Sequence, residues 1–331
     1  MATRVFSFFP RSSASLRTLF TSTSCRSSPY DYGIDPGPLF FNPKIHNLLQ
    51  RLLGCDYNKI FAAQKLGVRL DVPKYKFMTN EELEEAMKEA EKKASVRLQM
   101  PPLLKEREPI NGTLSSNPEI KYHDDFKYVF TDITLGHSDR SRAIVVRDPD
   151  GTLRQASWDE RARMNQIFFP NKFRSLKVPP MFADENLKSL LEREEYLFIL
   201  DKACIQFEPD DPEYIRATRK TYNHINEHGH YDVLYSTRHY GPMTLHLVLE
   251  KRIDDLLLHL IKQLKLESAA DLVRIYNITH KTEKDADNFT LIKEFIATDS
   301  LKKGILELAL DTYQEIQQQS QEMQSLRQAS S

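Results

Sequence analysis

The sequence predicts an α+β fold that is mainly α, in which a small antiparallel β-hairpin region precedes a C-terminal α-helical array of stacked hairpins. Short β-type runs joined by a turn sequence occur between residues 127 and 155, whereas every strong pattern after about residue 184 is helical. The helical segments follow one another with short connections, which favours antiparallel neighbours. No repeat of the letters is visible, so the sequence indicates no named repeat class.

Length and composition are those of a globular protein. The chain has 331 residues, of which 40% are hydrophobic and 28% are charged. No apolar run approaches the roughly eighteen residues of a membrane-spanning helix, so we expect no membrane partner. Cys55 and Cys204 lie far apart and form no C-x-x-C pair, which favours small core residues over a disulfide framework or a zinc ribbon.

Residues 1–29 are typical of a mitochondrial transit peptide. They carry four arginines among serines, threonines and phenylalanines, and no acidic residue precedes Asp31. The alternative is a disordered basic tail. A transit peptide directs import of the chain into mitochondria, so we expect the protein to be localised in the mitochondrial matrix. Without these arginines, the 46 basic and 47 acidic residues of the whole chain become 42 and 47, a net charge of −5. An acidic protein is not held to nucleic acid by its overall field, so any RNA contact needs a local basic patch.

We expect residues 30–118 to form an extended and helical N-terminal segment. Residues 44–53 place apolar side chains at helical spacing, and Thr79 with Glu82 forms a capping box that begins a second helix. The apolar stripe of this second helix is thin and most of its surface is charged. It is therefore either a solvated strut or a helix that lies on a partner, and we favour the partner. Prolines and serines in residues 100–118 predict a loop.

Residues 119–180 form the predicted β-hairpin plus helix region. Three runs have strand character: KYVFTDIT (127–134), AIVV (143–146) and TLRQ (152–155). The D-P-D-G sequence between the last two predicts a tight hairpin turn. Ser157 with Glu160 forms a second capping box, which begins a helix that ends near Pro170.

Residues 181–317 form the predicted C-terminal helical domain. Asp211 and Pro212 begin a helix that Gly229 ends. Three more segments have apolar residues at helical spacing: Ile253, Leu256, Leu257, Leu260, Ile261 and Leu264; Leu272, Val273, Ile275 and Tyr276; and Leu301, Ile305, Leu308 and Ile316. The glutamine-rich end, residues 318–331, predicts a disordered tail.

The stretch AIVVRDPDGTLRQ (143–155) matches the opening motif of haloacid-dehalogenase-type phosphatases, with Asp148 as nucleophile and Asp150 as acid and base. That chemistry needs the later strands of a doubly wound sheet, and the sequence offers successive helices instead. Asp254 and Asp255 could hold Mg²⁺, but they fall in the first turn of a helix, where carboxylates complement the helix dipole. We interpret Asp148 and Asp150 as turn residues and expect no catalytic residue, cofactor or small-molecule substrate.

A histidine cluster, NHINEHGHYD, is a candidate metal site. His224 and His228 lie four residues apart on a predicted helix, a spacing that can chelate zinc, and His230 follows. No third and fourth ligands are evident, and histidines near a helix end commonly bond its last carbonyls. We therefore assign no metal.

Positive charge concentrates between residues 140 and 177, which we call the basic island. It contains nine basic residues against four acidic ones, a local charge of +5: Arg140, Arg142, Arg147, Arg154, Arg161, Arg163, Lys172, Arg174 and Lys177. Phe168, Phe169 and Phe173 lie among them and could stack on bases or pack in the core. The basic island is suited to contact with the phosphates of RNA, and the alternative is an ordinary solvated surface.

Long stretches of the chain resemble one family. The residues that carry the resemblance are RLQMPPLLKEREPIN (97–111), KYVFTDIT (127–134), IVVRDPDGTLRQASWDERARMNQIFFP (144–170), QFEPDDPEYI (206–215) and YDVLYSTRHYGPM (231–243). Between about residues 44 and 317 the sequence is similar to the mitochondria-specific family of small-subunit ribosomal proteins numbered twenty-two.

The resemblance implies a structural constituent of the mitochondrial ribosome small subunit in the mitochondrial matrix. It implies other small-subunit ribosomal proteins and small-subunit rRNA as partners, a role in mitochondrial translation, and no catalytic residues. Besides the phosphatase, one further alternative stays open from the residues alone: a free helical-repeat adaptor that binds mitochondrial transcripts.

Overall fold

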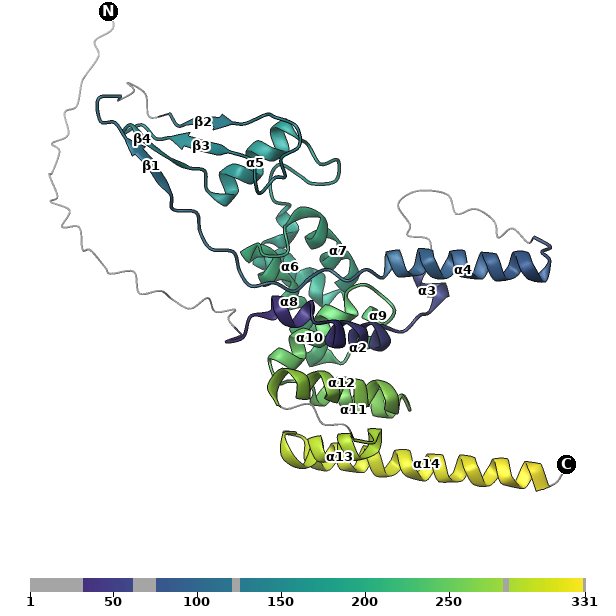
Figure 1. The fold of residues 1–331 in the computed structure, drawn as a ribbon. Helices are drawn as coiled ribbons and strands as arrows, with labels where there is room; N and C mark the ends of the chain where they lie inside the picture. The colour runs from purple at the N-terminus through teal and green to yellow at the C-terminus, as the bar shows by residue number, and fades with distance from the viewer. Residues whose placement is uncertain (1–31, 62–75, 121–125, 282–285, 330–331) are drawn as a thin grey trace, which may run out of the picture. The chain divides into compact units, whose positions relative to one another are not determined.

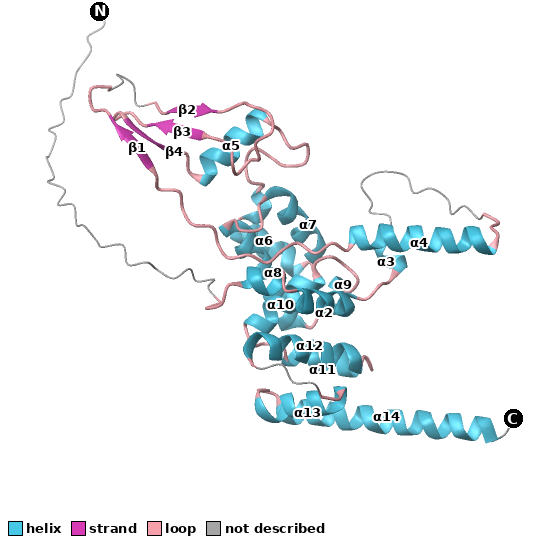
Figure 2. Cartoon of the chain, in the orientation of Figure 1, coloured by secondary structure: helices cyan, strands magenta, loops and turns pink. Residues whose placement is uncertain are grey.

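The computed structural model describes residues 32–61, 76–120, 126–281 and 286–329 (Figure 1). The predicted transit peptide lies outside these residues. The described chain is mainly helical and contains one small antiparallel sheet, which confirms the predicted α+β, mainly α fold (Figure 2). None of the described helices combines the length and the apolar composition that crossing a membrane requires.

The described residues of the N-terminal part form four helices: α1 (Pro36–Phe40), α2 (Pro43–Leu53), α3 (Tyr57–Ile60) and α4 (Asn80–Arg97). Asn42 caps α2, and the predicted capping box of Thr79 and Glu82 begins α4. The apolar face of α2 is buried and packs on α10 (Tyr240–Leu249) and α12 (Leu266–His280). The helix predicted at 44–53 is therefore confirmed, and it belongs to the core of the later helices.

The sheet has four antiparallel strands in the order β1-β4-β3-β2: β1 (Thr113–Ser116), β2 (Tyr128–Thr131), β3 (Ile144–Arg147) and β4 (Thr152–Gln155). The predicted strands correspond to β2, β3 and β4. The predicted loop at 100–118 is wrong in part, because β1 lies inside it. TLSS shows little apolar alternation, and its pairing with β4, irregular between Thr113 and Ser115, is a non-local contact.

Helix α5 (Trp158–Phe168) begins at the predicted capping box of Ser157 and Glu160 and covers one face of the sheet. Ile144, Val146 and Ala156 are buried, with Val129 and Met164 packed against them. This small core is separate from the large core of the helical region.

The helical region contains one 3₁₀ turn, η1 (Pro180–Phe182), and the remaining helices: α6 (Asp184–Glu192), α7 (Tyr196–Gln206), α8 (Pro212–His228), α9 (Tyr231–Leu234), α10, α11 (Asp254–Lys262), α12, α13 (Asn288–Thr298) and α14 (Lys303–Ala329). Several pairs of consecutive helices pack on each other, among them α7 and α8, α11 and α12, and α12 and α13. Helix α10 is buried along its whole length. As predicted, Asp211 caps α8 and Gly229 ends it in the left-handed conformation.

The glutamine-rich end differs from the prediction. Helix α14 continues to Ala329, so most of residues 318–331 is helical rather than a disordered tail. The physical reason is that Gln, Glu, Met, Leu and Arg all have good helix propensity, and the segment contains no Gly or Pro to end the helix.

Candidate nucleic-acid interface

The basic island does not form one continuous cationic surface, because two of its arginines are buried. Arg142 and Arg161 are 3% and 8% exposed. Arg142 donates hydrogen bonds to three carbonyls of residues 132–137. Arg161 Nη2 donates to the carbonyls of Arg140, at 2.8 Å, and Arg142, at 2.7 Å. These two guanidinium groups hold the loop before β3, and solvent-borne phosphates do not reach them.

Arg154 is held by two carboxylates. Its Nε lies 2.7 Å from Asp148 Oδ2, and its Nη1 lies 2.8 Å from Glu160 Oε2. The hydrogen bonds from Arg154 lower the pKa of Glu160 to about 2, so this carboxylate stays charged at neutral pH. Arg154 thus joins the hairpin turn to the first turn of α5.

Three further arginines also have partners within the chain. Arg140 Nη2 lies 2.7 Å from Asp210 Oδ1, and Arg174 Nη2 lies 2.8 Å from Glu208 Oε1. Arg147 Nη1 donates to the Gly151 carbonyl at 3.1 Å. The first two pairs connect the basic island to the loop between α7 and α8.

Arg163, Lys172 and Lys177 are exposed, and no hydrogen bond or ion pair joins them to another described residue. We call these three residues the exposed basic set. Phe168 and Phe173 beside them are 50% and 71% exposed. The exposed basic set lies on α5 and on the loop that follows it. Gln166 ties this loop to α5, because its Nε2 donates to the carbonyls of Asn171 and Arg174.

The outer face of the sheet was not singled out by the sequence. Tyr128 and Phe130 are 41% and 53% exposed, and Val129 between them packs in the core with α5. The cross-strand partner of Tyr128 is Arg147. Successive strand residues point to opposite faces, so in YVFT the side chains of Tyr128 and Phe130 must lie on the face opposite to Val129. This alternation of direction was the sequence signal that could have predicted the exposed aromatic face.

Asp148 and Asp150 form the hairpin turn, as interpreted from the sequence. Thr152 N donates to Asp150 Oδ1 at 2.9 Å, and this bond lowers the pKa of the Asp150 carboxyl. Gly151 has a φ of +84° and its amide donates to the Asp148 carbonyl. The strands on either side are antiparallel, so the parallel-strand platform of a haloacid-dehalogenase-type phosphatase is missing at this motif.

The three histidines gather around one tyrosine. The Tyr196 hydroxyl lies 3.0 Å from Nδ1 of both His224 and His230. The rings of His224 and His228 stack with their centroids 4.1 Å apart, and burial lowers the pKa of His224, aided by the charge of His228. The four-residue spacing of His224 and His228, which could have suited zinc, therefore brings their two rings into a stack. Across the described part of the chain, no group of three His, Cys, Asp or Glu side chains could hold a metal ion.

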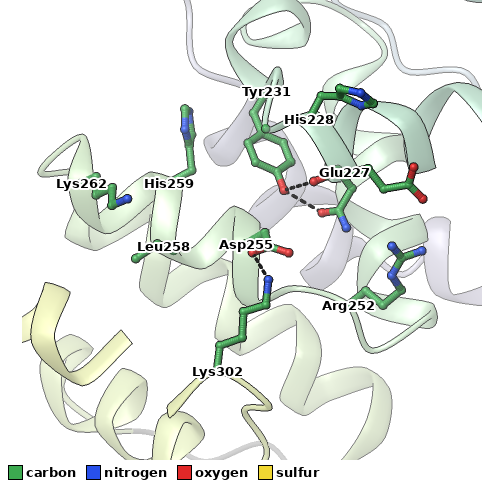
Figure 3. A pocket seen from close by; sticks show the side chains of 11 residues that line it. Glu227, His228, Tyr231, Arg252, Asp255, Leu258, His259, Lys262 and Lys302 are labelled. Atoms are coloured by element: carbon green, nitrogen blue, oxygen red, sulfur yellow. Dashed lines mark hydrogen bonds and ion pairs between the residues drawn. The ribbon is translucent and has the colours of Figure 1, made fainter. Parts of the chain in front are cut away.

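A polar hollow of about 530 Å³ opens between α8, α9, α11 and the start of α14 (Figure 3). Its lining includes Glu227, His228, Tyr231, Arg252, Asp255 and Lys302. Lys302 Nζ lies 2.5 Å from Asp255 Oδ1, and the Tyr231 hydroxyl donates to Asn226 Oδ1 at 2.6 Å. The polar groups of the hollow thus bond to separate partners and do not converge on a common point, which is the arrangement of a solvated surface hollow.

Comparison with known proteins gives a consistent result. A family model described as mitochondrial 28S ribosomal protein S22 matches residues 38–281. The chain is 42% identical over 289 residues to the small ribosomal subunit protein mS22 of Mus musculus, covering 84% of this chain and 79% of the relative. It is 41% identical over 286 residues to the protein of the same name from Bos taurus, with the same two coverages. The chain therefore belongs to the mitochondrial 28S ribosomal protein S22 family.

Proposed function

We propose that this chain is a structural constituent of the small subunit of the mitochondrial ribosome, acting in mitochondrial translation in the matrix. The observation that carries the proposal is the similarity to proteins named as small ribosomal subunit protein mS22, which extends over 84% of the chain. Its partners are then other small-subunit ribosomal proteins and the small-subunit rRNA.

The role is scaffolding rather than catalysis. Asp148 pairs with Arg154, Asp150 accepts from Thr152 N, and Asp255 of the polar hollow pairs with Lys302, so these carboxylates make contacts within the chain. Large apolar side chains remain exposed in several parts of the described chain, among them Phe77 before α4 and Leu308 on α14, which are 102% and 68% exposed. Such residues favour a protein that completes its surface by contact with neighbours.

We assign the rRNA contact to the exposed basic set, Arg163, Lys172 and Lys177, with Phe168 and Phe173 available for stacking on bases. The support is that these cations have no hydrogen-bond or ion-pair partner in the described chain, whereas the other six of the basic island bond internally. Such cations can neutralise phosphates without breaking a structural contact.

For the domain organisation we propose the division that the sequence predicts. Residues 1–29 are removed on import; residues 30–118 lead into the sheet region at 119–180, and residues 181–317 form the helical domain. Helix α2 packs on α10 and α12, so the first part of the N-terminal segment folds with the helical domain.

Sedimentation of tagged chain from mitochondrial extract tests the function. We expect the tagged chain to migrate with the small-subunit rRNA in a sucrose gradient and to shift to lighter fractions after nuclease treatment. A tagged matrix protein of similar size is the control. Recovery of the chain only in light fractions of untreated extract contradicts the proposal, and transcript crosslinks in those fractions favour the free adaptor.

A further inference from the structure

Helix α4 is anchored to the rest of the described chain near its C-terminal end. Ala94 is its one buried residue, and Arg97 Nη1 donates to the Ile60 carbonyl at 2.9 Å. The Arg97 guanidinium also lies 4.9 Å from the centroid of the Phe61 ring. Figure 1 shows α3 beside the helix, in agreement with these contacts. The N-terminal half of α4 has no comparable anchor to the described residues.

This N-terminal half exposes an apolar stripe. Leu83 and Met87 are 45% and 61% exposed, and they lie four residues apart, on one face of the helix. Phe77 and Met78, just before the helix, are 102% and 42% exposed. Met and aromatic residues are enriched in the centres of protein interfaces, where the flexible thioether adapts to a partner.

Carboxylates flank the stripe. Glu84 and Glu91 lie three residues before and four residues after Met87, so they are its neighbours on the helix surface. The N-terminal half of α4, residues 80–88, contains four glutamates and one basic residue, Lys88. Glu82 is engaged in the capping box, whereas Glu84 forms no hydrogen bond or ion pair with a described residue. Nor does Glu91, which lies just beyond the N-terminal half of α4 and whose charge acts on the Tyr57 hydroxyl of α3. The helix dipole accounts for acidic residues in the first turn, but not for Glu91 in the fourth.

From this pattern we propose that the N-terminal half of α4 is a docking site for a basic, apolar-bearing segment of a neighbouring small-subunit protein. The inference rests on the proposed function, which supplies the protein neighbours. Charge decides the class of occupant. An RNA backbone is repelled by unpaired glutamates, whereas proteins that share an RNA particle carry Lys and Arg to neutralise phosphates. Apolar side chains of the same segment cover Leu83 and Met87.

A photo-crosslinking residue placed in the full chain tests the site in assembled particles. We replace Met87 with benzoylphenylalanine, irradiate purified small subunits and analyse the products after nuclease digestion. The matched control carries the same probe at Glu85, two residues away and on the opposite side of the helix. We expect a crosslink to a different protein, within a Lys- and Arg-rich peptide, that is several-fold stronger from position 87 than from 85.

Charge reversal gives a second readout. Glu84→Lys with Glu91→Lys should lower the yield of the position 87 crosslink several-fold, whereas Glu81→Lys with Glu85→Lys, the same change in net charge on the other side of the helix, should leave it near the original value. Equal loss from both double variants contradicts a specific docking face.

Three other outcomes also overturn the proposal: a crosslink to rRNA, to a second copy of this chain, or to another part of the same chain. A yield at position 87 no higher than at position 85 does so too. Sedimentation separates this failure from failure of the proposed function. A probe-bearing chain that migrates with the small subunit and gives no protein crosslink refutes only the docking site.

Discussion

The guanidinium carbon of Arg142 lies 3.7 Å from the centroid of the Phe169 ring. The same guanidinium donates to the carbonyls of Asp132 at 2.9 Å, Thr134 at 3.0 Å and His137 at 3.0 Å. One buried cation thus joins the loop after β2 to the end of α5. This arginine is a structural centre of the sheet region, although by sequence it belongs to the basic island.

Replacing Arg142 by Ala should therefore destabilise the protein. Three carbonyls of the loop after β2 would lose the buried guanidinium as their donor, and the Phe169 ring would have no cation over its face. We therefore expect the free energy of unfolding to fall by about 2–4 kcal/mol. Urea unfolding followed by the fluorescence of Trp158, the one tryptophan of the chain, measures this. Arg163→Ala, an exposed change on α5, is the control and should leave the urea midpoint nearly unchanged. Equal midpoints for both variants contradict the structural role.

The contrast between these two arginines shows where sequence reasoning reached its limit. Counting charge identified the basic island, but all nine basic residues contribute equally to such a count. Which of them turns inward depends on three-dimensional neighbours. One local signal existed for Arg161. It lies three and four residues from Trp158 and Asn165 on a predicted helix, and Asn165 is also buried, so the two share the sheet-facing side.

Local chemistry explains which elements were predicted well. The capping boxes at 79 and 157 and the D-P-D-G turn act within four residues, so the sequence alone specifies α4, α5 and the β3–β4 hairpin. Strand β1 was missed because its partner β4 is distant in the sequence and TLSS has no periodic apolar pattern. Tertiary contacts likewise place α2 in the helical core.

Replacement of Gly151, in the turn between β3 and β4, should destabilise the protein more than replacement of Gly136, in the loop between β2 and β3. Its φ is +84°, and a Cβ at this position would lie 2.2 Å from the Asn117 carbonyl oxygen. Gly136 has a similar φ of +93° with nothing within 4 Å of such a Cβ, so it isolates the cost of backbone conformation alone. We expect Gly136→Ala to cost about 1 kcal/mol and Gly151→Ala clearly more. If Gly136→Ala and Gly151→Ala lower the thermal stability by similar amounts, the Asn117 carbonyl moves away from the new Cβ of residue 151 without cost, and the prediction is wrong.

The buried His246 should make stability depend on pH. Its Nδ1 lies 2.7 Å from the Tyr32 hydroxyl and its Nε2 lies 3.2 Å from Asn223 Oδ1. Burial, with Arg219 and Arg252 nearby, lowers the pKa of His246 from 6.5 to about 3. Between these two values the unfolded chain binds the proton and the folded chain does not, so stability falls as the pH drops below about 6.5.

A pH series of urea unfolding measures this effect. One such histidine contributes up to about 1.4 kcal/mol per pH unit, or about 2 kcal/mol between pH 6.5 and pH 5. His246→Gln should make the stability less dependent on pH over this range, whatever its effect at pH 7. His239, whose pKa is also lowered by burial, leaves some dependence in the variant. An unchanged slope shows that His246 does not carry the effect.

The exposed basic set should govern binding to RNA without supporting the fold. Combined Arg163→Glu, Lys172→Glu and Lys177→Glu should leave the urea midpoint unchanged, because no described residue forms a hydrogen bond or ion pair with these cations. The affinity of the triple variant for the small subunit should fall below that of the original chain, and this difference should be largest at low salt, where phosphate contacts contribute most. The association that remains should depend less steeply on salt, since a chain that touches fewer phosphates releases fewer counterions on binding. The fraction of tagged chain that migrates with the particle over a series of KCl concentrations measures this.

The matched control reverses three exposed cations outside the basic island, Lys188, Arg193 and Lys202, and so makes the same change in net charge. If both triple variants lose the same fraction of particle-associated chain, the loss is a general effect of charge. That result contradicts an RNA contact at the exposed basic set. A triple variant that included Arg142 or Arg154 could not make this distinction. Arg142 is buried and Arg154 holds Asp148 and Glu160, so a carboxylate in either place would disrupt the sheet region before any RNA contact was tested.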